Sequence, residues 1–163
     1  MIECISYERV NDLYFNDSPE KAIEVFGEPE LKSKSRSGNI ELYYDISKKN
    51  TFDYKIIFDE NNKFSEFMLY PFTKVKINKM DIKWTLEGIL PIIEQDSDPR
   101  MDPYSITLYD LGILFGEFNP EYIKSNGSIN IFRKGELDEF RKDTKPFNLN
   151  EYHLQPSTLQ IND

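Results

Sequence analysis

Three aspartates in one short segment come closest, in type and spacing, to a metal site. Asp96, Asp98 and Asp102 lie in the segment QDSDPRMDP. A calcium loop requires oxygen ligands at positions 1, 3 and 5, glycine at position 6 and glutamate at position 12. Counted from Asp96, arginine, methionine and threonine occupy positions 5, 6 and 12. We therefore expect residues 94–102 to form a solvated acidic loop, and a metal-dependent enzyme that uses these three aspartates remains the alternative function.

Histidine and cysteine are too scarce for the common nucleophilic mechanisms. His153 is the only histidine and Cys4 the only cysteine, whereas nucleophilic catalysis needs a base that is oriented by a third group. We expect Cys4 to be a small core residue. Glu41 and Asp45 share one face of a predicted strand, where paired carboxylates can do acid–base chemistry, but a polar outer face is the commoner origin of this pattern. The sequence therefore predicts no catalytic residue, no cofactor and no metal ligand.

Tyrosines next to carboxylates are the pattern most typical of a protein interface in this sequence. The chain has ten tyrosines and twelve phenylalanines, and a tyrosine ring supplies contact area at little cost in conformational entropy. We expect Tyr43 and Tyr109 to lie on an outer sheet face among acidic residues. The predicted partner-binding residues are Glu41, Tyr43, Asp45, Asp96, Asp98, Asp102 and Tyr109.

The charge distribution favours a basic protein partner over nucleic acid. The 163 residues include 29 acidic and 20 basic side chains, for a net charge of −9. Residues 1–30 and 81–121 are strongly acidic and flank a mildly basic stretch at residues 31–80. Phosphate binding requires a basic face, whereas an acidic surface speeds encounter with a basic protein. With no apolar run long enough for a membrane span, a single cysteine and charged residues near the N-terminus, we expect a cytoplasmic protein without membrane contacts.

The first half predicts one short helix followed by three strands. Ser18 precedes a proline and an acidic residue, as a helix cap does, and Gly27 can close the helix after residue 26. Apolar and polar residues then alternate with period two over residues 40–45, 52–58 and 64–70. That period is typical of antiparallel strands with one buried face.

The second half repeats this order. Helical spacing from Asn78 to Ile93 predicts a helix that Pro91 kinks or ends. Residues 105–118 predict two strands with a bend at their glycines. A short helix is expected to begin at residues 119–121, a strand covers 128–133, and residues 136–142 form a last helical turn or two.

These elements predict a single α+β domain over residues 1–163. We expect one or more antiparallel sheets with short helices packed on one face. Two helix-plus-meander cycles would occupy residues 12–72 and 78–142, and residues 143–163 would form an extended tail.

Parts of the sequence resemble known protein families. The segments LYDLGI (residues 108–113) and SINIFRKGELDEF (residues 128–140) look like those of bacterial immunity proteins of contact-dependent and polymorphic toxin systems. The first half, from SPEKAIEVFGEPE onwards, is similar to folds like that of the beta-lactamase inhibitor protein, in which a short helix packs on an antiparallel sheet. The resemblance implies a non-enzymatic inhibitor that occludes a basic, nuclease-type toxin domain. A housekeeping assembly module is a further alternative.

Overall fold

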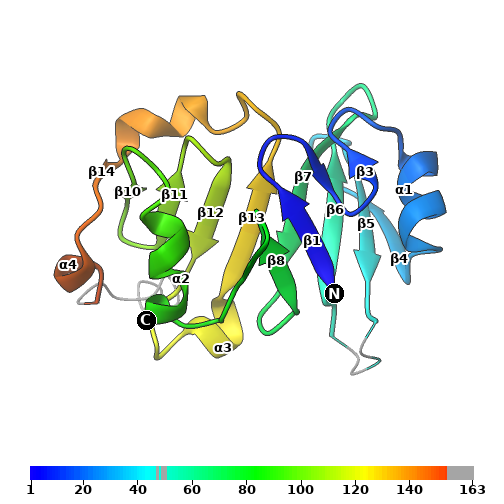
Figure 1. Ribbon diagram of the computed structural model, residues 1–163. Helices are drawn as coiled ribbons and strands as arrows, with labels where there is room; N and C mark the ends of the chain where they lie inside the picture. The colour runs from blue at the N-terminus through cyan, green and yellow to red at the C-terminus, as the bar shows by residue number, and fades with distance from the viewer. Residues whose placement is uncertain (47, 49–50, 154–163) are drawn as a thin grey trace.

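The computed structural model describes residues 1–46, 48 and 51–153 and shows an α+β fold with two sheets (Figure 1). The larger sheet contains, in spatial order, β14 (Lys145–Pro146), β10 (Arg100–Met101), β11 (Ser105–Leu108), β12 (Ile113–Gly116), β13 (Ser128–Phe132), β7 (Phe64–Leu69), β6 (Tyr54–Phe58), β5 (Ile40–Tyr44) and β4 (Leu31–Lys34). The smaller sheet contains β3 (Leu13–Tyr14), β2 (Arg9–Val10), β1 (Ile2–Ile5), β8 (Val75–Ile77) and β9 (Met80–Asp81). The helices are α1 (Pro19–Phe26), α2 (Leu86–Ile93), α3 (Ile123–Asn126), the 3₁₀ helix η1 (Asp138–Asp143) and α4 (Leu149–His153).

The larger sheet is built from two antiparallel meanders that meet in its centre. Strands β4 to β7 follow α1, and strands β10 to β13 follow α2. The last strands of the two meanders, β7 and β13, pair antiparallel and join them into one continuous sheet. The predicted order of a helix followed by strands is therefore present twice.

One face of the larger sheet carries the core. Inward residues of its strands are almost fully buried, among them Ile56 and Phe67 of the first meander and Phe115 and Ile129 of the second. The ring of Phe26 on α1 packs 5.6 Å from those of both Tyr54 and Phe67. Helix α2 adds three buried isoleucines to the same cluster, and Figure 1 shows α2 and the smaller sheet in front of the larger one.

The predicted first helix and three strands are confirmed. The Ser18 hydroxyl accepts a hydrogen bond from the Lys21 amide and caps α1, and Gly27 adopts a φ of 83° directly after it. Strands β5, β6 and β7 fall within the predicted ranges.

The helix predicted from Asn78 is wrong at its start. Asn78 and Lys79 both have positive φ values and form the turn of the β8–β9 hairpin. The side chain of Asn78 also bonds to the backbone and hydroxyl of Ser6, so tertiary contacts override the helical spacing. Helix α2 begins only after Thr85, whose hydroxyl accepts from the Gly88 amide.

The smaller sheet contains contacts that local patterns do not reveal. Strands β1 and β8 pair in parallel although about seventy residues separate them, as between Cys4 and Ile77. Cys4 is fully buried, as expected, and burial raises the pKa of its thiol well above the ordinary value. The smaller sheet thus ties the start of the chain to the connection between the two meanders.

Most of the remaining second half is as predicted. Strands β11 and β12 flank a bend at Gly112, where a φ of 66° and the nearby Tyr7 ring leave no room for a side chain. Strand β13 and η1 lie where a strand and helical turns were expected.

The segment after residue 143 is more ordered than an extended tail. It includes β14 and α4, and the buried Tyr152 hydroxyl accepts from the Phe118 amide at 3.0 Å. The rest of the predicted tail, residues 154–163, lies outside the described part of the chain. Within the described part, no helix has the length and apolar character needed to cross a membrane.

Candidate functional site

The second face of the larger sheet is half-exposed, and we call it the open face. Helix α1 and the core lie on the opposite side. Along β5, β6, β7, β12 and β13, half-buried side chains of the open face alternate with the buried core residues. Its central residues are Glu41, Tyr43, Lys55, Ile57, Glu66, Met68, Leu114, Asn130 and Phe132, all of intermediate burial.

Strand pairing brings these residues from distant parts of the chain into one continuous surface. Leu114 lies opposite Asn130, Asn130 opposite Met68, Met68 opposite Lys55, and Lys55 opposite Tyr43. The row therefore runs from β12 in the second meander to β5 in the first. Met68 lies in its middle between Asn130 and Lys55, and Leu114 and Tyr43 lie at its two ends.

A charged group surrounds Tyr43. Its hydroxyl donates to the Glu41 carboxylate at 2.7 Å, and the Lys55 ammonium lies 3.5 Å from the same carboxylate. The Lys55 nitrogen also lies 5.4 Å from the centre of the Tyr43 ring. Burial, together with the Glu41 carboxylate, raises the pKa of Tyr43 to about 12, so its hydroxyl stays protonated as a hydrogen-bond donor at neutral pH. The group presents a rigid aromatic ring inside a network of charges.

Glu66 is a second carboxylate of the open face and lies nearer its centre. The Asn130 side-chain amide donates to it at 2.7 Å. Burial nevertheless raises the pKa of Glu66 above its ordinary value, because water is replaced around a charge that one neutral donor stabilises only in part. Holding the ionised Glu66 carboxylate at this position therefore lowers the free energy of unfolding.

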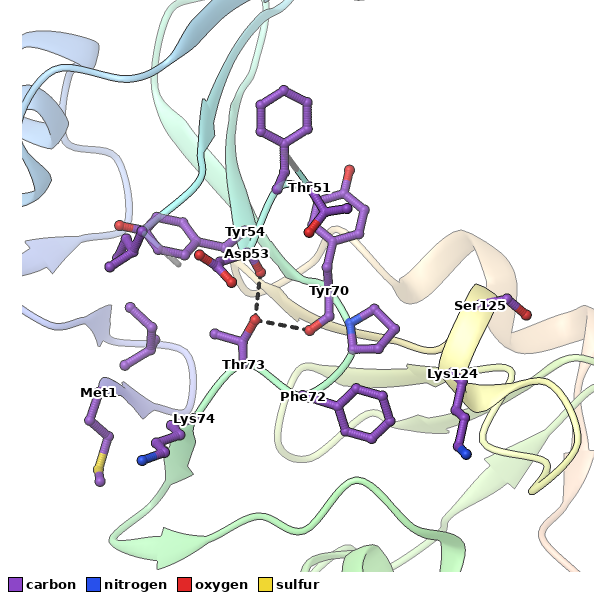
Figure 2. Close-up of a pocket in the computed structure, with 14 residues that line it drawn as sticks. Met1, Thr51, Asp53, Tyr54, Tyr70, Phe72, Thr73, Lys74, Lys124 and Ser125 are labelled. Atoms are coloured by element: carbon purple, nitrogen blue, oxygen red, sulfur yellow. Dashed lines mark hydrogen bonds between the residues drawn. The ribbon is translucent and has the colours of Figure 1, made fainter. Parts of the chain in front are cut away.

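Aromatic side chains connect the open face with a groove beside the start of β6 and the end of β7. The rings of Tyr43 and Phe52 lie 4.8 Å apart, and Phe52 and Tyr70 both line this groove of about 770 Å³. Figure 2 shows the Thr73 hydroxyl, which lies 2.7 Å from the Asp53 carbonyl oxygen and 3.0 Å from that of Tyr70. These contacts hold the loop that exposes Phe72, a residue with a positive φ of 68°.

The structure places the predicted residues of the first half together. Glu41 and Tyr43 lie on the open face, and Asp45 follows directly after β5, where its amide donates to Glu30. Sequence reasoning missed Lys55, Glu66 and other partners on the neighbouring strands. Their alternation with buried residues was visible, but which strands are neighbours was not.

Two of the predicted residues in the second half lie near η1. Asp98 forms ion pairs with Arg100 at 3.6 Å and with Arg141 at 2.7 Å. The Arg141 guanidinium also lies 4.9 Å from the Tyr109 ring centre. Tyr109 is only 7% exposed and lies in the turn after β11, so the expectation that it lies on an outer sheet face is wrong, and Arg141 of η1 covers its ring.

The acidic loop is less solvated than predicted. Asp96 is buried, and its carboxylate accepts from the amides of Asp98 at 2.9 Å and Asp110 at 2.8 Å. Burial raises the pKa of Asp96. Asp102 accepts from the amides of Tyr104 and Ser105. These two carboxylates organise the loop backbone; Asp96 is buried, whereas Asp102 is half-buried.

The three aspartates do not form a common ligand set. Asp96 and Asp102 bond to backbone amides, while Asp98 pairs with arginines. Across residues 1–46, 48 and 51–153, no group of three or more histidine, cysteine, aspartate or glutamate side chains is placed to hold a metal ion.

Comparisons of the chain with protein-family models, with curated proteins and with solved structures find no match.

Proposed function

We propose that this protein is a non-enzymatic binding protein, an immunity protein that neutralises a basic, nuclease-type toxin in the bacterial cytoplasm. In this proposal the open face covers the active face of the toxin. The observation that carries the proposal is the composition of that face, which combines the apolar side chains of Met68 and Leu114 with Tyr43 and with the carboxylates of Glu41 and Glu66.

Two physical effects support this proposal: acidic charge that accelerates association with a basic partner, and an aromatic contact that slows dissociation. A nuclease binds its substrate through a basic face, so carboxylates can occupy positions that phosphates otherwise take. Acidic charge speeds the encounter and fixes orientation. A central aromatic residue surrounded by less critical contacts then slows dissociation. Tyr43 suits this role because Glu41, Lys55 and Phe52 hold its ring in place before binding.

The metal-dependent enzyme is less well supported. Its residues would be Asp96, Asp98 and Asp102, and the backbone amides and arginines described above already engage all three carboxylates. An assembly module would use the same open face with another partner, and no separate observation favours it.

A co-expression experiment tests the proposal. The proposal predicts a toxin gene directly beside this one, and its toxin domain is expressed alone and together with the protein in a bacterial host. We expect growth to be restored by the wild type and by Tyr14→Ala, which removes a half-exposed tyrosine of the smaller sheet. We expect Tyr43→Ala to protect poorly while keeping the wild-type circular dichroism spectrum. If the wild type fails to restore growth, or if Tyr43→Ala protects fully, the proposal is wrong.

A further inference from the structure

A groove between η1 and the open face is separate from the Tyr43 end of the surface. Leu114 and Phe132 of the larger sheet form its floor, and Leu137 and Phe140 of the η1 segment form its opposite wall. Leu137 is buried, whereas Phe140 is 59% exposed. The volume of the groove is about 420 Å³, which lies within the usual range of binding cavities.

The rim of this groove is acidic. Four acidic residues, Glu66, Asp102, Glu136 and Asp143, are among its lining residues, and no lysine, arginine or histidine is. Glu136 pairs with Arg133, and Asp102 accepts backbone amides. We name this feature, with its apolar floor and acidic rim, the acidic groove.

Glu66 is a carboxylate whose burial its neighbours compensate only in part. Its described hydrogen bond comes from the neutral amide of Asn130, and the nearby Lys55 ammonium contacts Glu41 instead. Burial raises the pKa of Glu66, the carboxylates of Glu41 and Glu136 raise it further, and Asn130 and Lys55 lower it. A cation brought to this position would relieve the cost of burying that charge.

We propose that the acidic groove receives an arginine side chain of a basic protein partner. The inference rests on the proposed function, because it names one contact of the same open face. The methylene groups of the arginine pack on Leu114 and Phe132, and its guanidinium pairs with Glu66. The exposed ring of Phe140 can cover the guanidinium plane through a cation–π contact.

Charge and shape favour arginine over other occupants. A guanidinium is planar, always charged and less strongly hydrated than an ammonium, so it tolerates a half-buried site and pairs with a carboxylate through two parallel hydrogen bonds. A second copy of this chain is a poor occupant, because its net charge of −9 would repel an acidic groove. An anionic or purely apolar ligand would leave the Asn130 amide as the described hydrogen-bond donor to Glu66 and would bring no positive charge to it.

An NMR titration tests the groove without any toxin. The protein is titrated with N-acetyl-arginine amide and, as a neutral analogue of the same shape, with N-acetyl-citrulline amide. We expect saturable chemical-shift changes at the Leu114 methyl groups and the Phe132 ring, with affinity for the arginine compound roughly tenfold higher than for the citrulline compound.

Variants of matched charge complete the test. Glu66→Gln keeps an acceptor for Asn130, so we expect it to fold, and it should lower the affinity for the arginine compound by roughly tenfold. Glu24→Gln removes the same charge from the exposed surface of α1 and should leave the titration unchanged. Equal responses to both compounds, shifts elsewhere on the protein, or an unchanged affinity in Glu66→Gln would overturn the inference. These outcomes are distinguishable from failure of the proposed function, which the co-expression experiment measures.

Discussion

At the scale of single residues, the acidic side chains of this protein fall into two groups. Asp96 and Asp102 accept hydrogen bonds from the amides of their own loop and so stabilise its conformation. Glu41 and Glu66 lie on the open face, where Tyr43 and Asn130 donate to them. A count of acidic residues along the chain does not distinguish the carboxylates that stabilise a loop from those on the open face, because the distinction depends on their hydrogen-bond partners.

Glu66 carries a pH-dependent prediction. Its pKa in the folded protein is raised above the ordinary value of 4.5 by burial, so the fold disfavours the ionised carboxylate. Because the folded protein holds the proton of Glu66 more tightly than the unfolded chain, this group destabilises the fold at high pH. The penalty is absent below pH 4.5 and is complete once the pH has risen above the raised pKa of Glu66. Glu66→Gln removes that penalty and should unfold at a higher urea concentration than the wild type at pH 7.

The difference in stability to urea between Glu66→Gln and the wild type should shrink near pH 4, where the wild-type side chain is protonated. Urea unfolding curves at both pH values measure it, with Glu24→Gln as the control for loss of one exposed charge. A Glu66→Gln protein less stable than the wild type at pH 7 would show that the carboxylate is well compensated in the fold.

At the scale of elements, substitutions on the two faces of β6 test whether one face of the larger sheet is buried and the other is open. Phe58 is fully buried on the core face, next to the Phe64 ring at 6.3 Å, whereas Ile57 lies half-buried on the open face. Phe58→Ala should lower the free energy of unfolding by about 3–5 kcal/mol, because it leaves a large cavity. Ile57→Ala should cost clearly less, about 1–2 kcal/mol, since water already reaches its side chain.

Chemical denaturation of both variants measures this difference. Equal losses would mean that another part of the chain covers the open face, and the surface would then not be free for a partner. A small loss in Phe58→Ala would contradict the assignment of the core face itself.

The elements that local patterns predict well are those with strong, regular signals. The cap at Ser18 and the alternation in β5, β6 and β7 depend on nearby residues, and the bend at Gly112 is indicated by the glycine itself. The start of α2 was predicted too early, because Asn78 turns in a hairpin that its contacts with distant Ser6 stabilise. Such contacts have no signature in the local sequence.

At the scale of the whole molecule, the candidate site could be predicted only in part. Glu41, Tyr43 and Asp45 share one strand and its end, so period-two alternation was enough to group them. Glu66 and Asn130 meet only because β7 pairs with β13 across the two meanders. Asp96 was misjudged because the sequence shows its charge but not the amides of Asp98 and Asp110 that surround it.

The central claim is that the open face carries the proposed binding activity, and surface plasmon resonance against the proposed partner, a basic toxin domain, tests it most directly. Glu41→Gln combined with Asp45→Asn should mainly lower the association rate, and this effect should fade at high salt. The reason is that the Debye length falls from about 10 Å at 0.1 M to about 3 Å at 1 M ionic strength.

Tyr43→Ala should mainly raise the dissociation rate and weaken binding by roughly thirtyfold, as loss of about 2 kcal/mol from a central anchor implies. Tyr14→Ala and Glu24→Gln, which lie away from the open face, should bind like the wild type. The account is contradicted if the toxin binds with rates that neither salt nor any of the open-face substitutions changes, or if the two control variants are the ones that lose affinity.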